Sequence, residues 1–291
     1  FYAWSGFGAQ PPSAGQRRFI HDLDGFARLR EAAITGARSL PDAVVGVAPH
    51  SLRAVAPDEL ALLARIAGHN PVHIHIAEQV QEVEDCMAYY GQRPVEWLLD
   101  TFDVNEDWCL IHATHMTDAE TRRVAASKAV AGLCPVTEAN LGDGLFPAPD
   151  FLEAGGRIAI GTDSNVRIDV AEELRILEYG QRLHFRARNI LAQEGGSTGR
   201  RLFDAALAGG TQALGAPKPE ISPGAPADLV ALADGLKAGQ DDALLDRWIF
   251  GRDVATSDVW AAGAHVVRAG RHIHRDAVQV RFADVLRRVL S

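Results

Sequence analysis

Histidine and carboxylate side chains stand at the ends of three short apolar segments of this chain. His75 and Glu78 close the first segment, His112 closes the second, and Asp163 directly follows the third. A strand buried in a core seldom ends on such groups, whereas imidazoles and carboxylates are usual ligands of zinc. Bound zinc lowers the pKa of a coordinated water to about 7. The residue types and their positions therefore predict metal-assisted hydrolysis.

Each of these side chains has an expected role. His75 and Asp163 are the predicted metal ligands, and Asp163 is also expected to accept a proton from the water. His112 is either a third ligand or a base that orients the water. Glu78 stands three residues beyond His75, where it can carry a proton from water to a leaving nitrogen. Taken alone, Glu78 reads equally well as a solvated acid at the start of a helix.

His73 lies two residues before His75, so on a strand both side chains point to the same side. Such a pair could bind a metal together. His75 is nearer the carboxyl end of the segment, where a site would lie. We therefore expect His73 to be structural.

Strands and helices must alternate along the chain to place these groups together. The strand-like segments are short, apolar and bounded by turn residues: Val44–Ala48, Val72–Ala77, Trp108–Ala113, Ala129–Cys134 and Arg157–Gly161. The amphipathic segments between and after them predict helices over Pro57–Ala67, Val80–Leu99, Asp118–Ser127 and Val170–Arg188. This alternation predicts an α/β fold with a parallel sheet. Polar residues just after each strand are typical of a TIM barrel. A doubly wound sheet would usually carry a glycine-rich phosphate loop, and the sequence contains none.

The number of strands indicates a barrel that continues before the first residue. A sixth strand is expected to end near Trp4, whereas a closed barrel of this class has eight strands. We therefore expect two strands to precede Phe1 and the numbering to begin inside a longer protein. The predicted division is a barrel over residues 1–215 and a small β-sandwich portion over 216–291. In the second part, Val259–Val267, Gly270 and His272 are expected to form a β-hairpin with its tight turn near Ala269-Gly270, and Phe282–Leu290 is expected to form a helix.

Composition limits the classes of protein that the chain can represent. The formal net charge of −9 over 291 residues argues against nucleic acid as a partner. No apolar stretch reaches the roughly 18 residues of a membrane span. The three cysteines show no paired spacing, which indicates reduced thiols and a cytoplasmic location.

The chain resembles the amidohydrolase superfamily at the strand-end residues His75, Glu78, His112 and Asp163. His75-x-x-Glu78, His112 and Gly161-Thr162-Asp163-Ser164 are similar to the motifs of its mononuclear deaminase branch. The resemblance implies a TIM-like (β/α)8 barrel in which His75 and Asp163 bind one divalent metal. Glu78 would then be the proton shuttle, and His112 would contact the hydrolytic water. The branch's further His-x-His ligand pair is absent here, and His73-x-His75 is not its equivalent.

Five further segments sharpen the resemblance. They are Ser5–Gly8, Gly15–Phe19, Ala48–Val55, Thr137–Gly144 and Glu173–Arg182. They are similar to amidohydrolases that convert N-formimidoyl-L-glutamate, an intermediate of histidine degradation, to N-formyl-L-glutamate and ammonia. The resemblance makes His50 and Arg53 substrate-binding residues, and Tyr2 would reach the same site as a hydroxyl donor.

The substrate's two carboxylates agree with this assignment. An arginine on a loop after a strand, as expected for Arg53, can bind a carboxylate through two parallel hydrogen bonds. Arg17 and Arg18 form a loop pair of the kind that is usually solvated.

Two other functions remain open. A deaminase of an aromatic amine, such as a guanine, pterin or adenosylhomocysteine, would use the same metal residues without needing Arg53. A non-catalytic chain that only keeps the fold is the second. The expected metal is Zn²⁺, although iron or manganese would suit the same ligands. The expected partner is a small carboxylate-bearing substrate, with neither nucleic acid nor membrane, in a family where homodimers are common.

Overall fold

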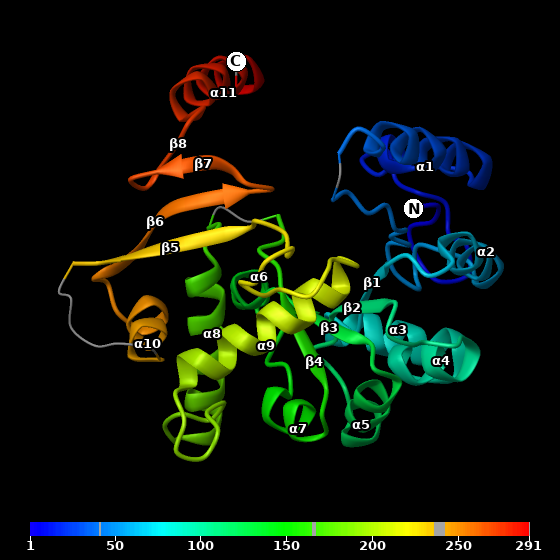
Figure 1. Cartoon of the computed structure of the whole chain (residues 1–291). Helices are drawn as coiled ribbons and strands as arrows, with labels where there is room; N and C mark the ends of the chain where they lie inside the picture. Colours follow the sequence, from blue (N-terminus) through cyan, green and yellow to red (C-terminus); the bar gives the residue numbers. More distant parts are fainter. Residues whose placement is uncertain (41, 165–166, 236–241, 291) are drawn as a thin grey trace. The chain divides into compact units, whose positions relative to one another are not determined.

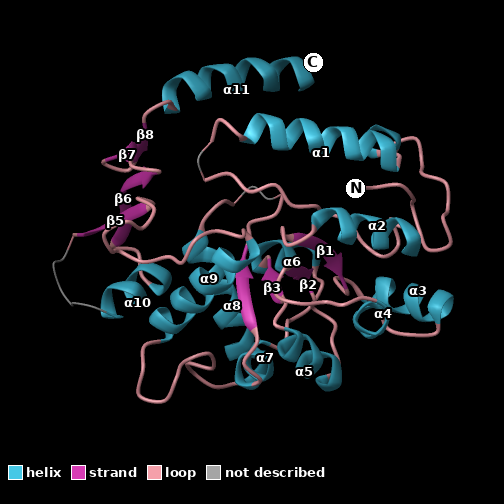
Figure 2. Ribbon diagram, turned by 45° about the vertical axis from the view of Figure 1, so that its right-hand side comes forward, coloured by secondary structure: helices cyan, strands magenta, loops and turns pink. Residues whose placement is uncertain are grey.

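The computed structural model describes residues 1–40, 42–164, 167–235 and 242–290. It divides into two compact units, Phe1–Lys218 and Pro219–Ser291. Figure 1 shows the order of the elements, and Figure 2 shows the same chain by secondary structure. The first unit carries every residue to which chemistry was assigned.

A parallel sheet forms the centre of the first unit. Its strands are β1 (Val72–Ile76), β2 (Trp108–His112), β3 (Val130–Leu133) and β4 (Arg157–Ile160), in the spatial order β1-β2-β3-β4. Along β1, Val72, Ile74 and Ile76 are buried and alternate with the partly exposed His73 and His75. This period of two places both histidines on one face of the sheet. The parallel α/β architecture predicted from the sequence is confirmed.

Helices separate the strands and cover the sheet. Those of the first unit are α1 (Leu23–Ala37), α2 (Pro57–Ala67), α3 (Val80–Tyr90), α4 (Pro94–Thr101), α5 (Asp118–Ser127), α6 (Pro135–Leu141), α7 (Ala148–Glu153), α8 (Val170–Phe185) and α9 (Thr198–Ala213), with a 3-10 turn at Arg17–Phe19. Helix α9 packs directly on β4, because a Cβ at Gly209 would lie 2.0 Å from the carbonyl oxygen of Ile158. Glycine is therefore required at that contact.

Capping residues, glycine and proline determine where the helices begin and end. Helix α5 begins and ends as expected, since Thr117 and Glu120 form a capping box at its start. The single helix predicted over Val80–Leu99 was wrong. Gly91, with φ of 73°, ends α3, and Pro94 begins α4.

Two predicted strands do not form. In Val44–Ala48 only Val47 pairs with β1, through a bridge to Val72. Pro49 follows and has no N–H to donate, so the ladder is interrupted before Ser51 bridges to His75. The strand expected to end near Trp4 is also absent. The amides of Ala3 and Trp4 both bond the carbonyl of Ala54 in a loop, rather than a neighbouring strand.

The second unit is built on one antiparallel sheet of four strands. These are β5 (Leu229–Asp234), β6 (Val254–Ala261), β7 (Ala264–Arg268) and β8 (Arg271–His272), accompanied by α10 (Asp242–Phe250) and α11 (Arg275–Leu290). The predicted turn at Ala269-Gly270 joins β7 to β8, and a second turn at Ala262-Gly263 joins β6 to β7. Helix α11 begins seven residues before the predicted Phe282.

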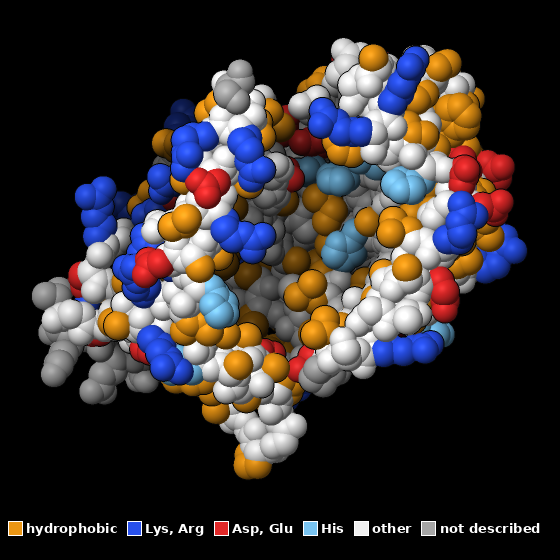
Figure 3. Space-filling model, turned by 90° about the horizontal axis from the view of Figure 1, so that it is seen from above, with side chains coloured by type: hydrophobic (Ala, Val, Ile, Leu, Met, Phe, Trp, Pro, Cys, Tyr) orange, Lys and Arg blue, Asp and Glu red, His pale blue; other side chains and the backbone are white. Residues whose placement is uncertain are grey.

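Charged side chains of both signs are interspersed with apolar ones on the face that Figure 3 shows. Among the described residues, no helix combines the length and apolar character needed to cross a bilayer.

Candidate active site

The backbone turns sharply where the strands deliver their polar side chains. Ala77, just after β1, has φ of 50°, His112 at the end of β2 has φ of 68°, and Asp163 beyond β4 has φ of 49°. Left-handed conformations are unfavourable for residues other than glycine and concentrate at functional sites, where the surroundings hold them. The carboxyl edge of this sheet is therefore held in a specific, strained shape.

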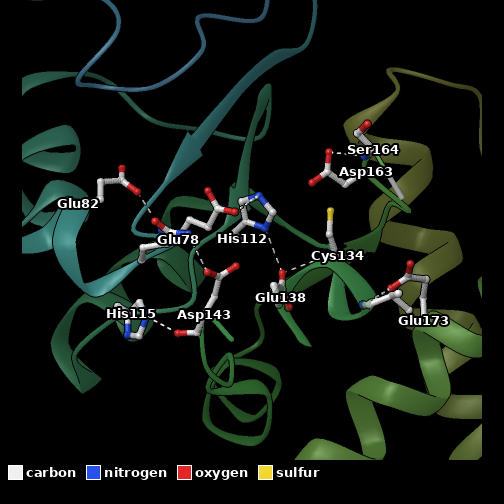
Figure 4. Close-up of polar contacts among 12 residues, drawn as sticks. Glu78, Glu82, His112, His115, Cys134, Glu138, Asp143, Asp163, Ser164 and Glu173 are labelled. Atoms are coloured by element: carbon white, nitrogen blue, oxygen red, sulfur yellow. Dashed lines mark hydrogen bonds and ion pairs between the residues drawn. The ribbon is translucent and has the colours of Figure 1, made fainter. Parts of the chain in front are cut away.

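His112 lies between two carboxylates at this edge. Its Nε2 is 3.5 Å from Oε1 of Glu78, and its Nδ1 is 3.2 Å from Oε1 of Glu138. His112 is 1% exposed and Glu138 is 5% exposed, so both are removed from water. Figure 4 shows the imidazole with Glu78 and Glu138 on different sides of the ring. The structure thus brings together Glu78 and His112, two of the predicted catalytic residues.

The surroundings strengthen proton binding by both members of this pair. Burial raises the pKa of Glu78, and the charges of Asp143 and Asp163 raise it further against the opposing effect of His112. Burial alone would lower the pKa of His112, but the hydrogen bond with Glu138 and the neighbouring carboxylates outweigh it, so this pKa is raised. Side chains with shifted pKa values in such a position are suited to proton transfer.

Glu82 holds the loop that carries Glu78. Its Oε2 accepts a hydrogen bond of 3.0 Å from the backbone N–H of Glu78, and burial raises its pKa to about 6. Glu82 sits in the first turn of α3, so the helix itself fixes the loop between β1 and α3. The backbone position of the proposed proton shuttle is consequently set by a side chain of α3.

His75 is oriented in the manner of a metal ligand. Its Nδ1 lies 2.7 Å from the carbonyl oxygen of His50, so Nδ1 donates and Nε2 keeps its lone pair. Burial lowers the pKa of His75, which favours the neutral, ligating form. The His75 ring stacks with His112 at a centroid distance of 5.7 Å and is tilted against His50 at 4.8 Å. His75 therefore fits a metal site.

Asp163 lies on the far side of His112 from Glu78 in the view of Figure 4. It is exposed, and its Oδ1 accepts a hydrogen bond from the N–H of Ser164. Its charge reaches both His75 and His112. Within the described part of the chain, no three His, Cys, Asp or Glu side chains converge on one metal-binding point. The described residues therefore do not by themselves form a complete metal-binding cluster.

Three predicted substrate-binding residues gather beside His75. Arg53 has no hydrogen bond or ion pair within residues 1–40, 42–164, 167–235 and 242–290, yet its charge acts on His50, His75 and Glu78. Burial, followed by the charges of His75 and Arg53, lowers the pKa of His50 to about 3, so that ring is neutral. The Tyr2 ring stands edge-on to His50 at 4.8 Å. A partly buried guanidinium without a partner is available to an anionic ligand.

His73, Arg17 and Arg18 differ in their contacts from the predicted site residues. Nε2 of His73 is 2.8 Å from the carbonyl oxygen of Ala213, a contact to α9 that is consistent with a structural role. Arg17 and Arg18 are exposed on the 3-10 turn. A cavity of about 270 Å³ adjoins the site and has aromatic walls that include Tyr2, Phe19 and Phe26.

Residues 9–264 match the amidohydrolase family. The chain belongs to this family. The membership predicted from the sequence motifs is confirmed.

Several relatives of this amidohydrolase are known. It is 50% identical over its whole length to formimidoylglutamate deiminase of Pseudomonas aeruginosa, and it spans 65% of that protein. An amidohydrolase of Brucella melitensis has 54% identity and a TM-score of 0.98 over the whole chain, which spans 65% of that structure. An adenosine deaminase of Xanthomonas campestris with bound zinc has 26% identity and a TM-score of 0.80, over 95% of this chain and 63% of that one.

Sequence reasoning about this amidohydrolase overlooked three carboxylates: Glu138 and Glu173, which are buried, and Glu82, which is partly buried. Glu82, Glu138 and Glu173 all contact backbone N–H groups near the site: those of Glu78, Cys134 and Val136. Each is an acid in the first turn of a helix. That position ordinarily indicates a solvated cap. Only the fold shows that these three acids face inward.

Proposed function

We propose that this amidohydrolase hydrolyses the formimidoyl group of N-formimidoyl-L-glutamate to N-formyl-L-glutamate and ammonia, a step of histidine degradation. The observation that carries the proposal is Arg53, a partly buried guanidinium without a bonded partner among the described residues, beside His50, His75 and Glu78. A guanidinium there matches a substrate with carboxylates. The name of the Pseudomonas aeruginosa relative supports the same substrate.

The acid–base pair performs the proton transfers. The oxygen of water adds to the formimidoyl carbon, and Glu78 moves the released proton to the imino nitrogen. Collapse of the tetrahedral carbon breaks the bond to that nitrogen, which takes the second proton of the water and leaves as ammonia. His112, 3.5 Å from Glu78, stabilises the charge that develops during both steps.

A single divalent metal, expected to be zinc, completes this proposal. His75 and Asp163 would hold it, and a bound metal would lower the pKa of the attacking water. The orientation of His75 through its Nδ1 supports this role. The zinc in the Xanthomonas campestris relative also supports it. A chelator should abolish turnover by the intact protein, and added zinc should restore it.

An aromatic amine is the competing substrate. The aromatic walls of the 270 Å³ cavity and the adenosine deaminase relative favour it. Ammonia release from formimidoylglutamate, compared with release from guanine, adenosine and pterin, distinguishes the two functions. We expect turnover of formimidoylglutamate alone. Faster release from a member of the aromatic panel would overturn the proposal.

A further inference from the structure

Glu138 makes an unusual pair of contacts from within the core. Its Oε1 accepts a hydrogen bond of 2.9 Å from the backbone N–H of Cys134 and lies 3.2 Å from Nδ1 of His112. An ionised carboxylate can only accept hydrogen bonds. With Glu138 as the acceptor, this contact requires the His112 proton to lie on Nδ1.

We propose that Glu138 is a positioning residue that keeps the Nδ1–H form of His112 and directs Nε2 towards Glu78. This inference rests on the proposed function, because it assigns a purpose to the His112–Glu78 contact. With Nδ1 occupied, Nε2 is the nitrogen that can accept or return a proton at 3.5 Å from Glu78. The opposite tautomer would turn a lone pair towards the Glu138 carboxylate and cost about the free energy of an unsatisfied buried group.

The backbone around Glu138 prevents its carboxylate from moving away. Its side chain folds back onto Cys134, the residue that precedes α6, while its carbonyl accepts the N–H of Asp143 at 3.0 Å. His112 in turn has a left-handed φ of 68°. A conformation of this kind persists only where its surroundings determine it. The bond to Glu138 is one such determinant, and it sets the direction of the ring as well as its tautomer.

Glu173 provides a matched control in the same place. It is also buried, and its Oε2 accepts a hydrogen bond of 2.8 Å from the N–H of Val136, at the same end of α6. That bond is to the backbone and not to His112. Glu138→Gln and Glu173→Gln each replace a buried carboxylate at this helix end by its neutral isostere. Only the first changes a partner of the imidazole.

The experiment measures the His112 ring and catalysis in the intact, zinc-loaded protein. Histidine ¹⁵N NMR reports which ring nitrogen carries the proton, and the His112 signals are assigned by their loss in His112→Asn. We expect a protonated Nδ1 in the wild type and in Glu173→Gln, and a changed pattern in Glu138→Gln, because a glutamine amide can donate to Nδ1. We expect Glu138→Gln to lower kcat about 10- to 100-fold with little change in KM, and Glu173→Gln to keep kcat within about threefold.

The outcomes separate this inference from the proposed function. A wild-type His112 protonated on Nε2 alone would overturn the inference without any variant. Equal losses of kcat in Glu138→Gln and Glu173→Gln would overturn it as well. Both substitutions would then lower kcat by disturbing the folded structure around α6, with no specific effect on His112. If the wild type does not turn over formimidoylglutamate, the proposed function fails, while the NMR pattern still decides the role of Glu138.

Discussion

At the scale of single residues, the site combines groups whose partners set their chemistry. His112 is held by carboxylates at both ring nitrogens, and His75 is turned by a backbone carbonyl so that one nitrogen is available. Arg53 is the contrasting case, because the described residues leave its guanidinium without a bonded partner. Two variants test these differences.

Glu78→Gln should remove proton transfer and leave the rest of the site intact. The isostere keeps the backbone bond from Glu78 to Glu82 but cannot accept a proton from water. We expect kcat to fall by about 10²- to 10⁴-fold, with bound metal unchanged. Steady-state kinetics and metal analysis provide the measurement. A variant with wild-type kcat would show that Glu78 is not the shuttle.

Arg53→Gln should weaken substrate binding more than chemistry. Loss of a charge-assisted hydrogen bond costs about 1.5–3 kcal/mol, which predicts a rise in KM of about 10- to 100-fold. The control is Arg18→Gln, an exposed arginine over the Phe19 ring, for which we expect wild-type kinetics. If both variants behave alike, Arg53 does not bind the substrate carboxylate.

At the scale of elements, helix starts and strand ends jointly build the site. Helix α3 holds the loop with Glu78 through Glu82, and α6 brings Glu138 onto His112. Helix α8 supplies Glu173, which holds the start of α6. Burial raises the pKa of Glu82 and of Glu173. The free energy of unfolding therefore depends on pH through these acids.

Glu173 should make the folded state less stable as the pH rises towards neutrality. Burial raises its pKa from 4.5 to about 7. Between these values the folded state binds a proton that the unfolded state has lost, so the stabilisation is complete below pH 4.5 and disappears as the pH approaches 7. The free energy involved is about 2–3 kcal/mol. Glu173→Gln should flatten this part of the pH profile in denaturant unfolding. An unchanged slope between pH 4.5 and 7 would contradict the assignment.

At the scale of the whole molecule, individual helices differ in how much of their side-chain surface is buried. Helix α8 in the first unit buries Leu174 and Leu177, whereas α11 in the second unit has no buried residue. Local opening requires less free energy where few apolar contacts must break.

Hydrogen exchange should reveal this difference. We expect the amides of α11 to exchange faster than those of α8 by at least about 100-fold, and the strands β1–β4 to exchange most slowly. Mass spectrometry of peptides from the exchanged protein measures each segment. Equal protection of α11 and α8 would show that α11 is covered in solution.

The sequence by itself determined the fold class, the family and the residues that end the strands. Apolar runs of strand length alternate with amphipathic helices, and this local pattern needs no tertiary information. It predicted β1, α2 and α5 closely, because period and capping are local properties. It failed at Val44–Ala48, where a proline interrupts the ladder with a strand distant in sequence. Only the tertiary structure decided that Glu82, Glu138 and Glu173 face inward and which ring nitrogen of His112 meets which carboxylate. A helix-starting acid looks the same in sequence whether it meets water or an imidazole, and its surroundings come from segments far along the chain.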